Sequence, residues 1–165
     1  MGTGFSIHVI TENLKFSAAH FIAYAGFREP LHGHNYQVGV RVEGNLAATG
    51  YVLDFGLVKK ITRKIVAPLD ERTIIPGNSD CLAIEKIGNE LSVRYGNDRF
   101  AFPLSDVAIL PIVHSSAEEL ARFIWTELRD ALRAQNALSE IMLIEISVAE
   151  GTGQTAIYSE KIAKF

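Results

Sequence analysis

Hydrophobic and polar residues alternate along two long stretches near the start of the sequence, residues 5–21 and 31–44. A period of two is typical of β-strands that have one buried face. In the second stretch the even-numbered positions from Tyr36 to Val42 are all apolar or aromatic. The pattern therefore predicts two long strands, each with one face toward the core.

Alternation in the first stretch places a largely apolar row on the core side, interrupted only by Glu12 and ending at His20. The row consists of Ile10, Leu14, Phe16 and Ala18. His32 and His34 lie two residues apart and begin the inward row of the second stretch. If the two strands pair, the three imidazole rings converge. Three histidines with an open fourth position are a recurrent catalytic zinc arrangement.

A pair of histidines on one strand also arises by chance, and imidazole suits iron, nickel and copper as well as zinc. The shared face of all three histidines and the nearby carboxylate of Glu29 favour the metal-site interpretation. Because neutral imidazole suits zinc well, Zn²⁺ is the expected ion.

Two amphipathic helices are indicated by apolar stripes with a period near 3.6. The first is expected to begin after Asp54 as its N-cap and to end before Pro68. The second is expected to follow Ser116, which forms a capping-box pattern with Glu119. The stripes are Leu57, Val58, Ile61 and Ile65 in the first helix, and Leu120, Phe123, Ile124, Leu128 and Leu132 in the second.

The remaining elements are shorter. The turn sequence Gly96-Asn97-Asp98 predicts a hairpin between residues 90–95 and 99–102. Two further strands are expected at residues 142–150 and 156–161, and residues 23–30 read as a loop. The element order predicts one α+β domain over residues 1–165, with a mostly antiparallel sheet backed by two helices.

Composition narrows the class of protein. The 165 residues carry a formal net charge of −3, so no basic excess favours nucleic acid or an anionic membrane as a partner. No apolar run has the length of a membrane span, and no basic-then-hydrophobic signal pattern opens the sequence. The lone Cys81 permits no internal disulfide, in keeping with a reducing cytoplasm, and we interpret it as structural or incidental.

Glu150 ends an expected inward row that contains Ile144, Ile146 and Val148. A carboxylate in such a place must find strong donors or stay protonated. One solution is a ligand with two parallel N–H groups, as in guanidinium-like heterocycles. The alternative is a strand-end residue that reaches solvent.

Three further groups are candidates for proton transfer. Glu29 lies three residues before the histidine pair, where a carboxylate can act as general base beside a metal-activated hydroxyl; a surface acid paired with Arg28 is the alternative. Asp70 ends the first helical region and is open to both interpretations. His114 precedes a helix N-terminus, whose dipole favours the neutral ring, although an ordinary loop histidine is the commoner case.

The runs FSAAHFI, LHGHNYQVGVRVEG, GYVLDF and HSSAEEL, together with the late strand ending in Glu150, resemble the 6-pyruvoyl-tetrahydropterin synthase and 6-carboxy-tetrahydropterin synthase family. The resemblance spans most of the chain and is weakest between residues 70 and 114. It implies a tunnelling fold, an antiparallel sheet with two helices on one face. It also implies a homo-oligomer, a hexamer built as a dimer of trimers, and 7,8-dihydroneopterin triphosphate as the pterin substrate.

The resemblance also implies roles for single residues. His20, His32 and His34 would hold zinc, which binds and polarises the side-chain hydroxyls of the substrate. Glu150 would anchor the pterin ring through its amino-pyrimidine edge, and Ser116 falls where the family usually has a threonine near the pterin.

Two departures from the family pattern affect the expected reaction. Synthases carry a cysteine base shortly before the histidine pair, whereas residues 26–30 contain Glu29 and no cysteine. The usual Asp-His dyad reads Asp70-Glu71 here. The segment FREPLHGHNY resembles the type III branch, which cleaves the substrate side chain to give 6-hydroxymethyl-7,8-dihydropterin, a folate precursor.

We therefore expect a zinc-dependent lyase with Glu29 as base or relay, and with Asp70 or His114 carrying the second proton. The alternatives are a 6-pyruvoyl- or 6-carboxy-tetrahydropterin synthase, and a non-catalytic oligomer that binds a pterin. The intact histidine triplet argues against the last of these.

Overall fold

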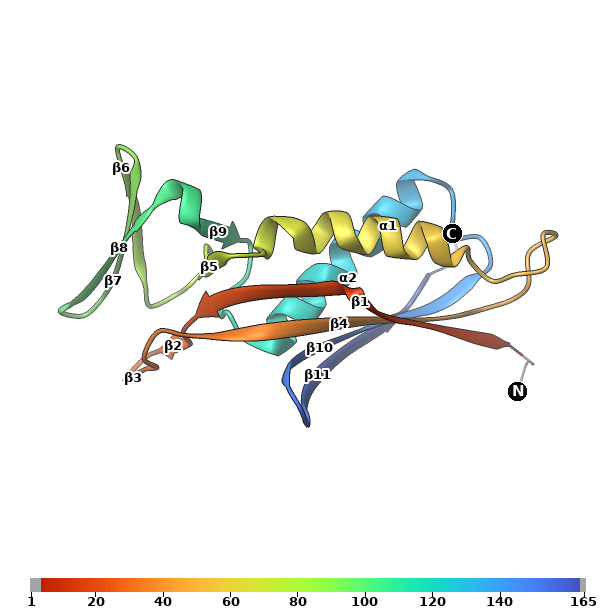
Figure 1. Ribbon diagram of the computed structural model, residues 1–165, viewed down its shortest axis with the longest axis horizontal. Helices are drawn as coiled ribbons and strands as arrows, with labels where there is room; N and C mark the ends of the chain where they lie inside the picture. Colours follow the sequence, from red (N-terminus) through yellow and green to blue (C-terminus); the bar gives the residue numbers. More distant parts are fainter. Residues whose placement is uncertain (1–3, 164–165) are drawn as a thin grey trace.

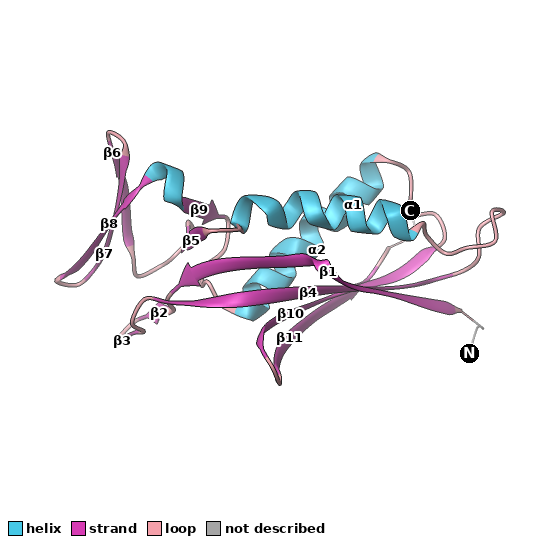
Figure 2. Cartoon of the chain, viewed as in Figure 1, coloured by secondary structure: helices cyan, strands magenta, loops and turns pink. Residues whose placement is uncertain are grey.

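The computed structural model describes residues 4–163, and its main feature is a six-stranded sheet with two helices packed against it (Figure 1). The order of strands is β11-β10-β4-β1-β5-β9. The strands are β1 (Phe5–His20), β4 (His32–Gly44), β5 (Arg72–Pro76), β9 (Val107–Leu110), β10 (Ile141–Gly151) and β11 (Gln154–Lys161). The helices are α1 (Phe55–Val66) and α2 (Ala117–Ala134). The mixed arrangement confirms the expected α+β class (Figure 2).

The two long strands pair as the alternation predicted. β1 and β4 are antiparallel, as are β4 with β10 and β10 with β11. The outer part of the sheet differs from the expectation, because β5 pairs parallel with β1 and β9 pairs parallel with β5. These two short strands were not predicted, since a short apolar run has too few residues to show a period.

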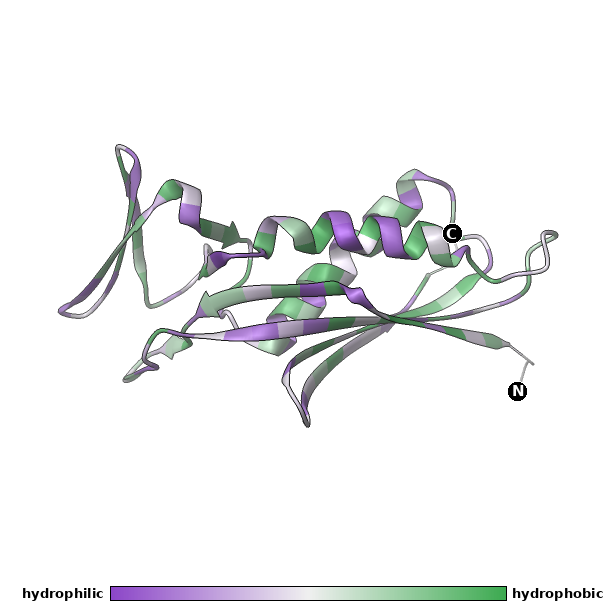
Figure 3. Ribbon diagram, viewed as in Figure 1, coloured by the Kyte–Doolittle hydropathy of each residue, from purple (hydrophilic) through white to green (hydrophobic). Residues whose placement is uncertain are grey.

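One hydrophobic core joins the inner face of the sheet to both helices. The even-numbered row of β4 from Tyr36 to Val42 is buried, as is the β10 row that leads to Glu150. From α2, Trp125 is 2% exposed and its indole N–H donates to the Ile144 carbonyl at 2.9 Å. Figure 3 shows hydrophobic and hydrophilic bands alternating along α1, as expected for a helix with one face on the core.

A bulge in β1 overturns the prediction for Ile10. Ile10 is 65% exposed, and its neighbour Val9 is buried instead. The pairing moves from Ile10↔Gly39 to Lys15↔Gln37, so residues 11–14 of β1 lie opposite a single residue of β4. An odd number of extra residues reverses which positions face the core. Past the bulge, the row that leads to His20 faces inward as predicted.

The side chain of Gln37 stabilises this bulge. Its amide nitrogen donates to the carbonyl of Thr11 at 3.1 Å and to that of Leu14 at 2.9 Å.

We expect Gln37→Leu to lower the free energy of unfolding by about 1–3 kcal/mol, because part-buried carbonyls lose their donor. Urea unfolding measures the change. The exposed Gln135, which donates to the Ala131 carbonyl, provides the control Gln135→Leu, expected within about 0.5 kcal/mol of the parent. Equal stability of both variants would show that these bonds contribute nothing.

Both helices begin where the sequence indicated. The Asp54 carboxylate accepts from the backbone N–H groups of Gly56 and Leu57, and the Ser116 hydroxyl accepts from that of Glu119. The Glu119 carboxylate binds Arg122. Of the two hydrogen bonds of a capping box, the one that forms is therefore from the Glu119 N–H to the Ser116 hydroxyl. After α1 the chain continues as a 3₁₀ turn, Ala67–Leu69, that contains Pro68. Within residues 4–163, neither helix is long and apolar enough to cross a bilayer.

A separate three-stranded sheet lies at one end of the molecule, at the left of Figure 1. We call it the accessory sheet; it consists of β6 (Ala83–Ile87), β7 (Glu90–Tyr95) and β8 (Asp98–Pro103). The hairpin of β7 and β8 was predicted, whereas β6 was not. A second buried cluster joins the accessory sheet to the end of β1 and to β5. It consists of Phe21, Ala23, Ile75, Leu91 and Val93.

The segment between β1 and β4, expected to be a loop, contains a small hairpin. Its strands are β2 (Ala23–Tyr24) and β3 (Phe27–Arg28). Gly26 takes a φ of +87° in the turn, a conformation that residues with a Cβ rarely adopt. We refer to residues 22–31 as the Glu29 loop. The hairpin gives this loop a defined path back to the histidines of β4.

Candidate active site

Three histidines from two adjacent strands meet at the end of the main sheet. His20 is directly opposite His32, and His34 is opposite Ala18, in the antiparallel register of β1 and β4. The ring centroids are 4.6 Å apart for His20 and His32, 5.1 Å for His20 and His34, and 4.9 Å for His32 and His34. One ring nitrogen of each lies within 4.8 Å of the others. The three imidazoles therefore converge, as the alternation predicted.

The hydrogen bonds of two of these rings fit metal binding. His20 Nδ1 is 2.6 Å from the Ser115 carbonyl oxygen, and His32 Nδ1 is 2.9 Å from the Pro30 carbonyl oxygen. A carbonyl only accepts, so each Nδ1 carries a proton, and in the neutral ring the lone pair that can bind a metal is then on Nε2. His20 Nε2 is buried without a hydrogen-bond partner in the described part of the chain. Burial lowers the pKa of His20 and favours the neutral ring that a metal requires.

Glu150 lies beside the histidines. Its two carboxylate oxygens are 3.9 Å from His20 Nε2 and 4.0 Å from His34 Nε2, beyond hydrogen-bond distance. The register between β10 and β11 shifts between Ala149 and Gly151, so Glu150 occupies a bulge at the end of the inward row. Its side chain is only 22% exposed. Of the two interpretations left open by the sequence, the inward-facing carboxylate matches the structure.

Glu29 is held close to the end of β1. Its carboxylate accepts from the Ile22 backbone N–H at 3.0 Å, and its own N–H donates to the Ile22 carbonyl at 2.9 Å. Arg28 binds the Glu29 backbone carbonyl and the carboxylate of Asp98. The alternative of a surface ion pair between the Arg28 and Glu29 side chains is therefore not what the structure contains.

Tyr36, predicted from the sequence only as a core residue, belongs to the surroundings of the site. Its ring centroid is 5.5 Å from that of His34 and 6.0 Å from that of His20. Its hydroxyl is buried and has no hydrogen-bond partner among the described residues. Burial raises the pKa of Tyr36, and the negative charges of Glu150 and Glu29 raise it further. Both carboxylates thus act on one hydroxyl beside the histidines. The only signal in the sequence was that Tyr36 shares its strand face with His34.

The other predicted residues lie in two places. His114 Nδ1 is 3.2 Å from the Ala23 carbonyl oxygen, which joins the start of α2 to the Glu29 loop. Ser116 is next to this contact and its hydroxyl caps α2. Asp70 accepts from the Ser17 backbone N–H at 2.8 Å, beside β1. Within the described residues, no hydrogen bond or ion pair links Asp70 to the three histidines.

Cys81 lies apart from this site. It is half-buried, packs with the second hydrophobic cluster, and its sulfur is 3.7 Å from the Ser79 hydroxyl. Of the two interpretations from the sequence, structural or incidental, the packing of Cys81 fits the first.

The whole fold is similar to known pterin enzymes. The crystal structure of Plasmodium vivax 6-pyruvoyl tetrahydropterin synthase matches with a TM-score of 0.93 and 34% identity, covering 98% of this chain and 100% of that chain. Two further structures of the Plasmodium vivax protein are described as mutants of a catalytic residue, in which a glutamate is replaced by cysteine or by alanine. The tunnelling fold expected from the sequence is thereby confirmed.

Two relatives differ in the reaction that their names state. A Methanocaldococcus jannaschii protein, assigned provisionally as a 6-carboxy-5,6,7,8-tetrahydropterin synthase, is 36% identical over 146 residues, 88% of this chain and 89% of that protein. The dihydroneopterin monophosphate aldolase of Pyrococcus furiosus is 41% identical over 60 residues, 36% of this chain and 51% of that protein. The family profile of 6-pyruvoyl tetrahydropterin synthase matches residues 9–161. The chain therefore belongs to the 6-pyruvoyl tetrahydropterin synthase family, whose members are lyases.

Proposed function

We propose that this protein is a zinc-dependent lyase that cleaves the side chain of 7,8-dihydroneopterin triphosphate to give 6-hydroxymethyl-7,8-dihydropterin, a folate precursor. The observation that carries the proposal is the convergence of three histidines next to a loop that offers Glu29 and contains no cysteine. A catalytic glutamate in the Plasmodium vivax relative supports the same role for Glu29. So does a relative named as an aldolase, because that reaction also breaks a carbon–carbon bond.

His20, His32 and His34 would hold the metal. His20 and His32 would bind it through Nε2, because the Nδ1 atom of each is hydrogen-bonded to a backbone carbonyl. Bound zinc would supply Lewis acidity that makes a coordinated side-chain hydroxyl of the substrate more acidic. The three ligands are neutral, so the site keeps the full positive charge of the ion for this purpose. The carbonyls of Ser115 and Pro30 orient the rings and raise their basicity.

The base decides which bond breaks. Glu29 would take the proton from a side-chain hydroxyl of the substrate. The electron pair of that O–H bond then forms the carbonyl of the leaving fragment, and the adjacent carbon–carbon bond breaks toward the conjugated pterin ring. A proton returned to the carbon attached to the ring completes 6-hydroxymethyl-7,8-dihydropterin. A synthase instead needs a base that removes a proton from carbon, and a thiolate and a carboxylate differ in basicity and reach.

His114 and Asp70 are the candidates for returning that proton. His114 is hydrogen-bonded to the Ala23 carbonyl in the Glu29 loop, so its position supports the role. Asp70 is bound to the Ser17 backbone, and we keep it only as the second candidate. Ser116, two residues after His114 in the sequence, is proposed to contact the pterin.

Glu150 is proposed to anchor the amino-pyrimidine edge of the pterin, because it is a carboxylate that faces inward and is free to accept two parallel N–H bonds. We expect Glu150→Gln to weaken binding of a non-reactive pterin by about 10- to 100-fold, with zinc content unchanged. Fluorescence titration measures the affinity.

Glu145 lies on the opposite face of the same strand, paired with Arg41, so Glu145→Gln is the matched control and should bind pterin like the parent. Equal affinity in Glu150→Gln and Glu145→Gln would remove Glu150 from pterin recognition.

A synthase that makes 6-carboxy- or 6-pyruvoyl-tetrahydropterin is the second candidate. The name of the Methanocaldococcus jannaschii relative favours it. The position of the only cysteine, Cys81, in the second hydrophobic cluster counts against it, because the synthases use a cysteine near the histidine pair.

We also propose that the chain assembles as a homo-oligomer, a hexamer, in the cytoplasm. β11 and β9 are the two edges of the main sheet, and edge strands are sites where another chain can add.

Product analysis tests the proposed function. Zinc-loaded protein is incubated with 7,8-dihydroneopterin triphosphate, and the pterin product is separated and identified by mass spectrometry. We expect 6-hydroxymethyl-7,8-dihydropterin. A pyruvoyl or carboxy product would establish the synthase instead, and no turnover by protein that binds both zinc and pterin would leave a binding protein.

A further inference from the structure

The accessory sheet is bonded to the loop that carries Glu29. The Arg28 guanidinium donates to one carboxylate oxygen of Asp98 through Nε at 2.9 Å and Nη2 at 2.8 Å. Its Nη1 donates to the backbone carbonyl of Glu29 at 2.7 Å. One side chain therefore links the first residue of β8 to the residue proposed as the base.

Three neighbouring contacts join the accessory sheet to the Glu29 loop and to Phe21, the residue before it. The Tyr95 hydroxyl donates to the Tyr24 carbonyl at 2.9 Å, at the tip of the β2–β3 hairpin. The Phe21 ring, next to His20 in the sequence, stacks on Phe100 with centroids 4.7 Å apart. The guanidinium of Arg28 lies 5.1 Å from the centroid of the Phe100 ring, within the range of a cation–π contact. The accessory sheet thus contacts both ends of the hairpin that precedes Glu29.

The placement of Glu29 depends on this hairpin. Its carboxylate and its backbone N–H are both bonded to Ile22, so the base is correctly oriented only when the chain from residue 22 to residue 29 keeps its path. Within residues 22–29, the Arg28 side chain is bonded to a residue outside the segment, Asp98. The Arg28 side chain is 22% exposed and that of Asp98 54%, and the two hydrogen bonds between them fix the geometry of the pair better than a single contact would.

We propose that the accessory sheet positions the general base, with Arg28 and Asp98 as the positioning residues that act through Glu29. The inference rests on the proposed function, because Glu29 must be the base for its position to affect the rate. Neither residue is required to touch the substrate. The accessory sheet would then be part of the catalytic machinery, although its own residues lie outside the histidine cluster.

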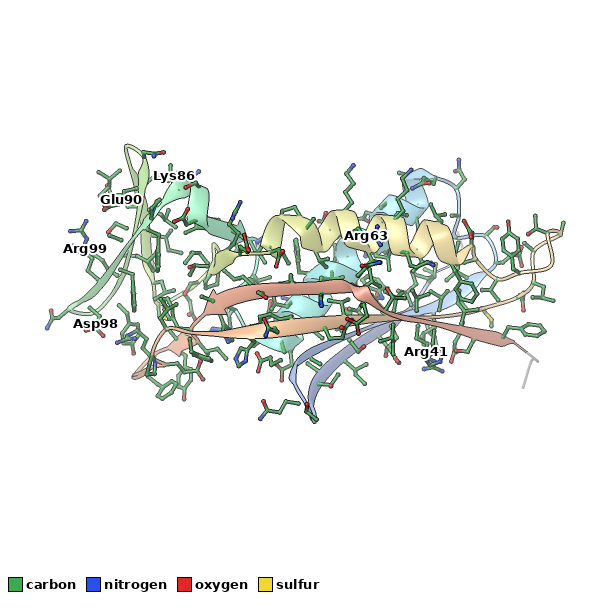
Figure 4. The ribbon with its side chains drawn as sticks, in the orientation of Figure 1. Arg41, Arg63, Lys86, Glu90, Asp98 and Arg99 are labelled. Atoms are coloured by element: carbon green, nitrogen blue, oxygen red, sulfur yellow. The ribbon has the colours of Figure 1, made fainter. Side chains whose placement is uncertain are left out.

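The first test is Asp98→Ala in the zinc-loaded protein, which removes the oxygen that accepts both bonds from Arg28. We expect kcat to fall about tenfold, since small displacements of a catalytic group cost large factors in rate. KM and zinc content should stay unchanged. The matched control is Glu90→Ala, which removes the 2.9 Å ion pair with Arg99 on the same sheet without touching the Glu29 loop. Figure 4 labels Asp98, Glu90 and Arg99, with Asp98 the nearest of the three to the hairpin. Equal kcat values for Asp98→Ala, Glu90→Ala and the parent would overturn the proposal.

A double variant separates positioning from a general loss of structure. In a Glu29→Ala background, Asp98→Ala should cause no further loss of the residual rate, measured with protein in excess over substrate. If the second substitution lowers that rate tenfold again, Asp98 acts independently of Glu29 and the proposal is wrong.

Hydrogen exchange gives a readout that does not depend on the reaction. In Asp98→Ala the amides of Ile22 and Glu29 should exchange at least about tenfold faster than in the parent, with the main sheet unaffected. If the parent makes no cleavage product but these amides respond in this way, the proposed function fails while the link between the accessory sheet and the loop stands. Unchanged exchange in Asp98→Ala would refute that link.

Discussion

Glu29→Ala will lower the rate of side-chain cleavage by about 10²- to 10⁴-fold, the range that a general base contributes. Zinc content should stay at the parental level, because the three histidines remain in place. Product formation from 7,8-dihydroneopterin triphosphate and metal analysis of the same sample provide the two measurements. The large effect is expected because no cysteine in the Glu29 loop can replace the carboxylate.

Glu29→Gln provides the control for the loop itself. A glutamine carbonyl oxygen can still accept from the Ile22 N–H, so the loop keeps its path while the basic carboxylate is lost. We expect this variant to be as slow as Glu29→Ala. Near-parental activity in Glu29→Gln would show that Glu29 shapes the loop and that another group takes the proton.

His32→Ala will lower zinc affinity by at least about 100-fold, more than the loss of an outer-shell partner usually costs. His32 is the most suitable of the three for this test, because it lies exposed at the start of β4, whereas His20 is buried. The fold should therefore tolerate the substitution. Competition with a chelator measures the affinity.

His8→Ala is the matched control for this substitution. His8 is also exposed and lies on β1, near the Ser6 hydroxyl and outside the histidine cluster. It should bind zinc like the parent. Equal zinc affinity in His32→Ala and His8→Ala would mean that the metal is held elsewhere.

The alternation of apolar and polar residues correctly predicted that the three histidines converge, and the reason is physical. The register that matters runs from Phe16↔Tyr36 to His20↔His32 and contains no irregularity. Each strand therefore keeps its parity over the part that forms the site. The same reasoning failed for Ile10, because the bulge at residues 11–14 lies between it and the site. A bulge is a property of the pairing of two strands, and one strand read alone does not reveal it.

The residues and contacts that surround the three histidines were harder to predict from the sequence. The Arg28–Asp98 pair joins residues 70 positions apart, and no local pattern indicates such a contact. Tyr36 was assigned to the core because an aromatic residue in an inward row has no other signature, and only the coordinates show that its hydroxyl is buried without a hydrogen-bond partner among the described residues. β5 was missed because its five residues show no period of their own. Its place in the sheet is set by pairing with β1 and β9.

A zinc titration of metal-free protein, with cleavage of 7,8-dihydroneopterin triphosphate as the readout, tests most directly whether the three converging imidazoles form the centre of the activity. The account predicts no 6-hydroxymethyl-7,8-dihydropterin without metal, and a linear rise in rate that ends at one zinc per chain. Cleavage at the full rate by the metal-free protein, or a rate that does not respond to zinc, would contradict it.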